Sequence, residues 1–398
     1  MNAPTPFIAT SADPLITGWA HTRFGRLDDD LEKLIVTVGR QALASAAVEP
    51  ADIEEIVIGH YNSGLVPVGF PSSLALQIHP DLLFTPATRV ENACASGSAA
   101  VAAGLRAVRA GDARHVLVIG VEKMTSASSE QVGAALLGAS YELAGEESTG
   151  GFAQMFADIA DTYVERYGDV EDALAMIASK NHANGARNPL AHLRKELDVD
   201  FCRTVSDRNP IVAGRLKRTD CSAVSDGAAA LVISRRDSAP QTEHGSVLIR
   251  GFAQANDYLP SDRRDATAFA GTRAAWQRAM ASADYELRDL SLLEVHDCFT
   301  IAELILYEAL GLSRPGEGHR VLDDGTVYPD GRLPVNLSGG LKAKGHPVGA
   351  TGVSQHVLGA MQVTGTAGPI QHSDARSVGI LNMGGTAVAN YASILERA

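Results

Sequence analysis

Short apolar runs alternate with longer amphipathic segments along the first third of the chain. Two segments predict helices: residues 31–48 place apolar side chains at three- and four-residue spacing, and residues 95–111 are rich in small residues. The apolar runs around them predict strands at 15–20, 53–60, 87–93 and 115–124. Strand–helix alternation of this kind predicts an α/β fold, with a mostly parallel sheet covered by helices on both faces.

The pattern changes in the middle of the chain and then returns. Residues 125–219 are polar and loop-rich, which indicates an insertion, and residues 225–234 lead back into a buried strand. Residues 289–297 repeat the pattern of residues 52–60, an acidic start and a short strand with a histidine near its end. This echo predicts two similar domains. The expected division is 1–124 plus 220–246 (N-terminal domain), 125–219 (loop domain) and 247–398 (C-terminal domain).

Composition excludes several classes of function. The 398-residue chain is 45% hydrophobic and carries a net charge of −13, which argues against a general nucleic-acid-binding protein. No apolar run approaches the roughly 18 residues of a membrane span. The first 14 residues lack the features of a signal peptide and predict a leader, and the C-terminal ILERA is not a peroxisomal address. We therefore expect a cytoplasmic protein.

Four cysteines are present, at positions 94, 202, 221 and 298, and none lies in a C-x-x-C pair. Zinc sites of the usual spacing are therefore not predicted, and in the cytoplasm these thiols should be reduced. Cys94 stands out because RVENACASGSAA places it between a strand and a helix. Free backbone N–H groups and the helix dipole there should favour the nucleophilic thiolate. The alternative is a buried structural cysteine.

Three further side chains are candidates for acid–base chemistry. His346 lies in KGHPVGATG, a glycine-rich turn before a helix, where a histidine is more often a surface residue. His296 and Cys298 lie two residues apart in VHDCF, so on an extended chain both point to one face. If that face opens on a pocket, imidazole and thiol converge there; otherwise both pack in the core.

The ordered set of motifs resembles the thiolase superfamily from about Pro14 onward. The matching blocks are HTRFGR, ENACASGSAA, VSDGAAALV, HDCF, GGLKAKGHPVGATG and NMGG. Thiolases more often have Asn-Glu-Ala-Phe in place of HDCF, and a second catalytic cysteine in a late Cys-x-Gly block. This chain reads Asn382-Met383-Gly384 there, which is similar to the sterol-carrier-protein class of thiolases.

The resemblance implies a fold and a set of roles. The fold would be a five-layer α-β-α-β-α sandwich of duplicated βαβ domains with an inserted loop domain. Cys94 would carry the acyl group as a thioester, and His346 would activate the Cys94 thiol. Cys298 would transfer the proton to or from the substrate α-carbon. His296 would serve one oxyanion hole, and the backbone N–H groups of Gly384 and Cys94 would form the other. The expected activity is that of an acetyl-CoA acetyltransferase, which cleaves 3-ketoacyl-CoA or condenses two acyl-CoAs.

Coenzyme A or acyl-CoA is the expected substrate, with no permanently bound cofactor and no metal. Cations concentrate in residues 180–218, which predicts a docking site for the ADP end of CoA, although half or more of them are expected to be ordinary surface charges. The resemblance further implies that Ser222 contacts the pantetheine arm. It also implies a homodimer or homotetramer, with a small OB-fold acyl-CoA-binding protein as a further partner.

Three alternatives share the expected fold. A ketoacyl synthase should show a histidine in a His-Gly-Thr-Gly context, which this chain lacks. A retro-aldolase of the sterol side-chain type should lack the nucleophile, whereas Cys94 is present. A scaffold subunit that depends on an active partner stays open from the sequence.

Overall fold

The computed structural model describes residue 10, residues 13–145 and residues 150–398. The predicted leader lies almost wholly outside these residues. Nine of the described strands form one hydrogen-bonded sheet, in the order β3-β2-β4-β7-β1-β8-β11-β10-β9. They are β1 (Pro14–His21), β2 (Glu55–Gly59), β3 (Ala87–Val90), β4 (His115–Glu122), β7 (Gly227–Arg235), β8 (Val247–Asn256), β9 (Leu292–Glu294), β10 (Ser377–Gly384) and β11 (Ala389–Arg397). Two short strands, β5 (Ile211–Ala213) and β6 (Leu216–Lys217), pair separately.

The sheet has two halves that meet at one short junction. β1 and β8 join them through two residue pairs, Leu15 with Leu248 and Ile16 with Val247. The expectation of a mostly parallel sheet is wrong: β2–β3, β2–β4 and β9–β10 are parallel, and the other five neighbouring pairs of the described sheet are antiparallel. The segment that follows β4 leaves the sheet and returns to it at the same end of the strands, where Glu122 faces Gly227. β7 therefore runs antiparallel to β4 without a crossover.

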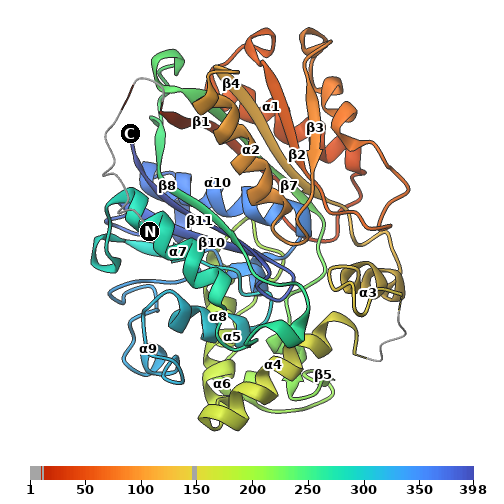
Figure 1. Cartoon of the computed structure of the whole chain (residues 1–398), viewed down its shortest axis with the longest axis vertical. Helices are drawn as coiled ribbons and strands as arrows, with labels where there is room; N and C mark the ends of the chain where they lie inside the picture. The colour runs from red at the N-terminus through yellow and green to blue at the C-terminus, as the bar shows by residue number, and fades with distance from the viewer. Residues whose placement is uncertain (1–9, 11–12, 146–149) are drawn as a thin grey trace.

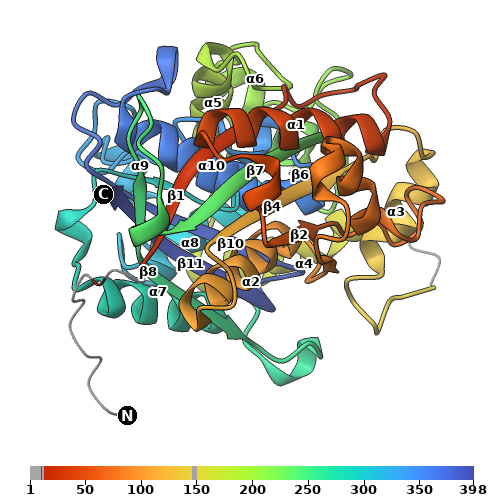
Figure 2. The ribbon, with the colours of Figure 1, turned by 90° about the horizontal axis from the view of Figure 1, so that it is seen from above.

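Helices cover both halves and fill the space between them (Figures 1 and 2). α1 (Leu31–Ala46) packs on the outer face of the first half, and α7 (Ala270–Ala283) packs on β8 and β11. α2 (Ser96–Ala110) and α10 (Thr351–Thr364) pack against each other, α2 on β2 and β4 and α10 on β10 and β11. These contacts form the predicted five layers, with α2 and α10 as the shared central layer.

The inserted region lies mainly on one side of this sandwich (Figure 1). It contributes α3 (Ser129–Leu137), α4 (Gly151–Tyr167), α5 (Glu171–Arg187) and α6 (Val199–Arg203). α4 and α5 pack on α8 (Thr300–Ala309). A further short α-helix, α9 (Arg320–Asp323), follows α8. Among the described residues no helix has the length and apolar character of a membrane span.

Chain segments that carry the predicted site residues meet between the two halves. Cys94 precedes α2, residues 296–298 follow β9, His346 precedes α10, and Gly384 ends β10. Close packing of small residues permits this meeting. A Cβ atom on Gly97 of α2 would lie 2.8 Å from the carbonyl oxygen of Gly349, so glycine lets α2 approach the turn that follows His346.

Candidate active site

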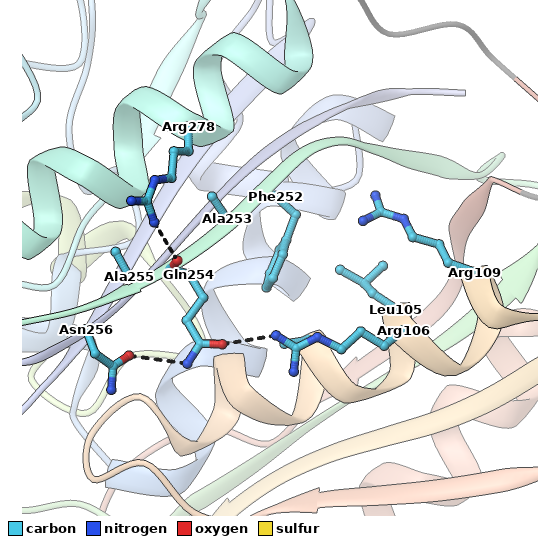
Figure 3. A pocket seen from close by; sticks show the side chains of 10 residues that line it. Leu105, Arg106, Arg109, Phe252, Ala253, Gln254, Ala255, Asn256 and Arg278 are labelled. Carbon is cyan, nitrogen blue, oxygen red and sulfur yellow. Dashed lines mark hydrogen bonds between the residues drawn. The ribbon is translucent and has the colours of Figure 1, made fainter. Parts of the chain in front are cut away.

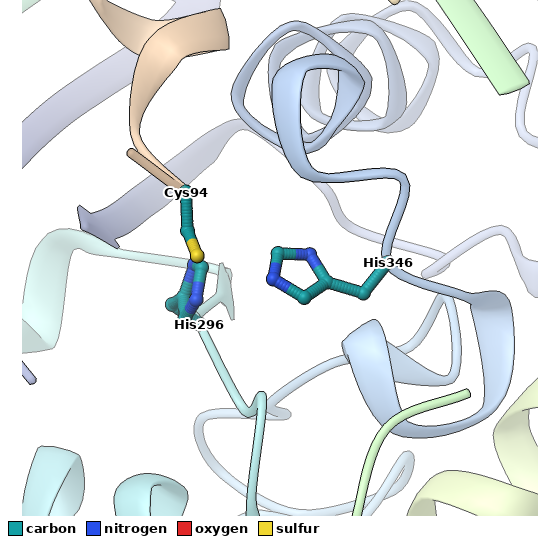
Figure 4. Close-up of side chains that lie close together, drawn as sticks. All are labelled: Cys94, His296 and His346. Atoms are coloured by element: carbon teal, nitrogen blue, oxygen red, sulfur yellow. The ribbon is translucent and has the colours of Figure 1, made fainter. Parts of the chain in front are cut away.

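Cys94, His296 and His346 lie close together, although they come from three distant parts of the chain (Figure 4). The Cys94 sulfur and one ring nitrogen of each histidine all lie within 4.8 Å of one another, and the three residues are buried. The two imidazole rings are perpendicular, with their centroids 5.0 Å apart. His346 is therefore not a surface-turn histidine, and Cys94 is buried but lines a cavity.

The thiol of Cys94 is held in its protonated form by its surroundings. Burial is the main cause that raises its pKa to about 12, and the nearby carboxylates of Glu122 and Glu91 act in the same direction. The backbone N–H groups of Gly385 and of Cys94 itself favour the thiolate and offset part of this effect. The expectation that the helix terminus would lower the pKa is wrong in this resting state, because desolvation outweighs the backbone donors.

His346 is arranged as a proton acceptor. Its Nδ1 lies 2.7 Å from Oγ1 of Thr351, and this hydroxyl donates its proton to the carbonyl oxygen of Pro347 at 3.1 Å. Nδ1 must therefore carry the ring proton, which leaves the lone pair on Nε2. Burial, helped by the charge of Lys344, lowers the pKa of His346 to about 3. The ring is thus neutral at rest, with a free nitrogen.

His296 has the opposite tautomer. The Nδ2 group of Asn382 donates to Nδ1 of His296 at 2.8 Å and to the carbonyl oxygen of Cys94 at 3.3 Å. Because an amide nitrogen only donates, Nδ1 of His296 accepts and Nε2 carries the proton. That Nε2 is buried and has no hydrogen-bond partner among the described residues. Burial lowers the pKa of His296 well below its usual value, so the ring is a neutral donor.

A cavity of 1080 Å³ opens beside these groups and is lined by Cys94, Cys298 and His346. Cys298 is buried, and burial raises the pKa of its thiol well above the usual value. Ser222 also lines the cavity, and its backbone N–H donates to the carbonyl oxygen of Cys298 at 3.0 Å. The side chains of the remaining wall are mainly apolar and include Met124, Val132, Leu136, Leu137, Phe152 and Phe299.

Gly384 lies where a larger residue does not fit. A Cβ atom there would come within 2.4 Å of the carbonyl oxygen of Asn92, in the loop that carries Cys94. The backbone N–H that influences the Cys94 sulfur belongs to Gly385, the next residue. Gly384 therefore lies against the Cys94 loop, and its role as an oxyanion donor stays a prediction.

The two halves of the chain match two models of one family. Residues 15–237 match the model of the thiolase N-terminal domain, and residues 253–397 match that of the thiolase C-terminal domain-like family. The chain belongs to the thiolase family. It is 35% identical to an acetyl-CoA acetyltransferase of Methanothermobacter thermautotrophicus, over 97% of this chain and 100% of that protein.

More distant relatives agree with this assignment. Sterol carrier protein 2 of Gallus gallus is 29% identical over 93% of this chain and 69% of its own length. Among solved structures, an Ltp2-ChsH2(DUF35) aldolase superposes with a TM-score of 0.80 at 22% identity, covering 97% of this chain and 98% of that one. At this identity the likeness shows a shared fold.

The cations predicted to bind CoA are only partly available in this thiolase-family chain. Lys180 is fully buried and pairs with Glu303 at 2.8 Å, and Lys217 is buried and lies 3.4 Å from Asp220. These two lysines tie the inserted region to residues outside it and do not face solvent. Exposed cations of the same region are Arg187, Arg194, Lys195, Arg203, Arg208 and Arg218, with Arg215 half-buried against Asp161. Of the exposed set, Arg203 pairs with Asp172.

Three site residues escaped the sequence analysis: Thr351, Asn382 and Gly385. Asn382 and Gly385 act through hydrogen bonds to distant parts of the chain, and one sequence gives no sign of such bonds. Thr351 offered the only local signal, since it follows His346 by five residues and begins α10.

A second hollow of 400 Å³, lined by α2, β8 and α7, holds Arg106, Arg109 and Arg278 but none of the predicted catalytic side chains (Figure 3).

Proposed function

We propose that this protein is a CoA-dependent thiolase that cleaves 3-ketoacyl-CoA, or condenses two acyl-CoAs, through a thioester on Cys94. The observation that carries the proposal is the pairing of a buried thiol with a neutral histidine, His346, that has a ring nitrogen within 4.8 Å of the sulfur. A thiol with a raised pKa needs such a base, because only the thiolate attacks a carbonyl. The family assignment agrees with this chemistry.

In the first half of the reaction, Nε2 of His346 takes the Cys94 proton and the thiolate attacks the ketone carbon of 3-ketoacyl-CoA. The developing oxyanion would be held by the backbone N–H groups of Cys94 and Gly384, next to that of Gly385. The α–β carbon bond then breaks and leaves the acyl group on Cys94. The departing enolate would be held by the Nε2–H groups of His296 and of protonated His346, and Cys298 protonates its α-carbon.

In the second half, the thiol of a second CoA gives its proton to the Cys298 thiolate and attacks the acyl–Cys94 thioester. When the thioester breaks, Cys94 regains its proton from His346. The products are acetyl-CoA and an acyl-CoA shortened by two carbons. Where the substrate carries an α-methyl group, propionyl-CoA is released in place of acetyl-CoA. All protons return to their starting positions, and reversal of these steps is a Claisen condensation. Ser222, on the cavity wall, is placed to contact the pantetheine arm in this scheme.

We further propose the setting of this reaction. The exposed arginines of the inserted region, such as Arg194, Arg208 and Arg218, would attract the ADP phosphates of CoA in a chain that is otherwise acidic. The protein would act in the cytoplasm, in lipid metabolism, as a homodimer or homotetramer. A small OB-fold acyl-CoA-binding partner is a further candidate, and one protein of the same fold is an Ltp2-ChsH2(DUF35) aldolase.

Mass spectrometry of the intact protein tests the proposal. Brief incubation with a 3-ketoacyl-CoA should add one acyl group to the wild type and none to Cys94→Ala, which should also lose turnover. Cys202→Ala is the matched control, because Cys202 of α6 is buried against α5 and does not line the cavity. A wild-type protein that is neither acylated nor active across a panel of 3-ketoacyl-CoAs, alone or with a candidate partner, would leave the scaffold alternative.

A further inference from the structure

The same three side chains have the composition of a metal site. Cysteine sulfur and histidine nitrogen are the ligands that Zn²⁺ prefers, and three protein ligands with one open position are usual where zinc is accessible to small molecules. The fold, and not a C-x-x-C spacing, brings these ligands together. Their atoms lie within 4.8 Å of one another, and ligands of a tetrahedral zinc ion are about 3.5 Å apart. Side-chain rotations that move the ligand atoms by about 1 Å would therefore bring them to the spacing of a zinc site.

We propose that Cys94, His296 and His346 bind a single soft divalent cation, Zn²⁺, which blocks the active site reversibly. Nε2 of His346 needs no change to act as a ligand, because its proton is on Nδ1. Cys94 gives up its thiol proton to solvent and binds as the thiolate. The nearby carboxylates of Glu122 and Glu91, which disfavour a free thiolate, favour a cation at this position.

His296 supplies the observation that points to a ligand at this position. Its Nε2 is buried and has no hydrogen-bond partner among the described residues, and one ring nitrogen of His296 lies within 4.8 Å of the other two ligand atoms. To bind zinc, His296 moves its proton from Nε2 to Nδ1, and the Asn382 amide turns so that Oδ1 accepts it. That Oδ1 also has no partner in the described structure, so the turn gives it one. The neighbouring charge of Lys344 opposes the cation.

The ion has a route to this site and room for a fourth ligand. Cys94 and His346 both line the 1080 Å³ cavity, where water, the thiol of Cys298 or the thiol of CoA lies within reach of the open position. Magnesium and calcium should not bind, because they prefer oxygen ligands. Inhibition by zinc rests on the proposed function, since the ion would capture the nucleophile. Binding itself does not depend on turnover.

Cadmium titration of the full-length, metal-stripped protein tests the site directly. Cd²⁺ is a close mimic of Zn²⁺ whose bond to thiolate absorbs in the ultraviolet, and we expect this absorption to saturate at one ion per chain. Zn²⁺ should displace Cd²⁺, and Mg²⁺ should not. Cys94→Ser should abolish the absorption while Cys202→Ala keeps it. His346→Gln and His296→Gln should each weaken binding by about 10-fold or more.

Two outcomes would overturn the proposal. One is an absorption that persists in Cys94→Ser, which places the ion on another cysteine such as Cys221. The other is an absorption that survives both histidine variants unchanged, which removes the imidazoles from the site. An active enzyme without the cadmium signal would refute the metal site alone, whereas an inactive protein with the signal would refute only the proposed function. Zinc inhibition should be reversed by a chelator.

Discussion

The rings of His296 and His346 lie perpendicular to each other with their centroids 5.0 Å apart, and they carry their protons on opposite nitrogens. The hydroxyl of Thr351 accepts a hydrogen bond from Nδ1–H of His346, whereas the side-chain amide of Asn382 donates a hydrogen bond to Nδ1 of His296. One imidazole therefore has a lone pair on Nε2, and the other has an N–H group there. This difference divides base and donor roles between two residues of the same type.

Thr351→Val should slow the reaction by removing the acceptor that fixes the His346 tautomer. Thr351 is fully buried and valine has nearly the same shape, so the fold should tolerate the change. We expect kcat/KM to fall about 10- to 100-fold, the usual cost of losing a partner that orients a histidine. Alkylation of Cys94 by iodoacetamide should slow in parallel. Thr351→Ser keeps the hydroxyl and is the control; equal losses in both variants would contradict the assigned role.

Cys298→Ala should separate the two halves of the chemistry. Transfer of an acyl group from a reactive acyl-CoA to Cys94 does not need a proton at the α-carbon, so the acylation rate should change little. Cleavage of 3-ketoacyl-CoA should fall about 10²- to 10⁴-fold, the range for loss of a general acid. Rapid-quench acylation and steady-state thiolysis measure the two rates. Similar losses in both would show that Cys298 has another role.

Most of the fold could be predicted from patterning, because the strands and helices of each half are local features. The strands predicted at residues 15–20 and 115–124 are present as β1 and β4, and the helix predicted at residues 31–48 is present as α1. The direction of β7 could not be predicted. It depends on where a long insertion re-enters the sheet, and the pairing of Glu122 with Gly227 is visible only in three dimensions.

The site was predictable in its residue types but not in its electrostatics. The motifs around Cys94, His296 and His346 identify the groups that meet, and the structure brings them together. The pKa of Cys94 could not be read in the same way, since position at a helix terminus and burial act in opposite directions. Which effect dominates depends on the packing around the sulfur, to which distant parts of the chain contribute.

Gly133→Leu should narrow the range of acyl chains that the enzyme accepts. Gly133 lines the cavity from α3, and a Cβ atom there meets no described atom within 4 Å, so a side chain would project into open space. We expect kcat/KM for long 3-ketoacyl-CoAs to fall about 10- to 100-fold, because methylene groups lose their pocket. Acetoacetyl-CoA should be affected about threefold or less.

Gly133→Ala provides the control for this change. It adds one methyl group and removes a glycine from a helix, which should stabilise the protein by about 1 kcal/mol with little effect on selectivity. The comparison separates a change in helix stability from a change in cavity volume. If leucine and alanine shift the chain-length profile equally, or neither shifts it, Gly133 does not face the acyl chain.

His356→Gln should reduce the loss of stability in mild acid. His356 is fully buried in α10, donates from Nδ1 to the carbonyl oxygen of Gly352 at 2.7 Å and lies 2.9 Å from Oγ of Ser393. Burial lowers its pKa to about 4, whereas an unfolded histidine titrates near 6.5. Between these values the unfolded chain binds the extra proton, so the free energy of unfolding falls as the pH decreases from 6.5 towards 4.

The variant lacks this group, so its stability should depend less on pH in that window, by up to about 1.4 kcal/mol per pH unit. Urea unfolding from pH 7.5 to 4.5 gives the two curves, and the difference in slope is independent of any constant cost of the substitution. Above pH 7 the curves should run parallel, because His356 is then neutral in both states. Curves that stay parallel down to pH 4.5 would show that His356 titrates normally in the folded protein.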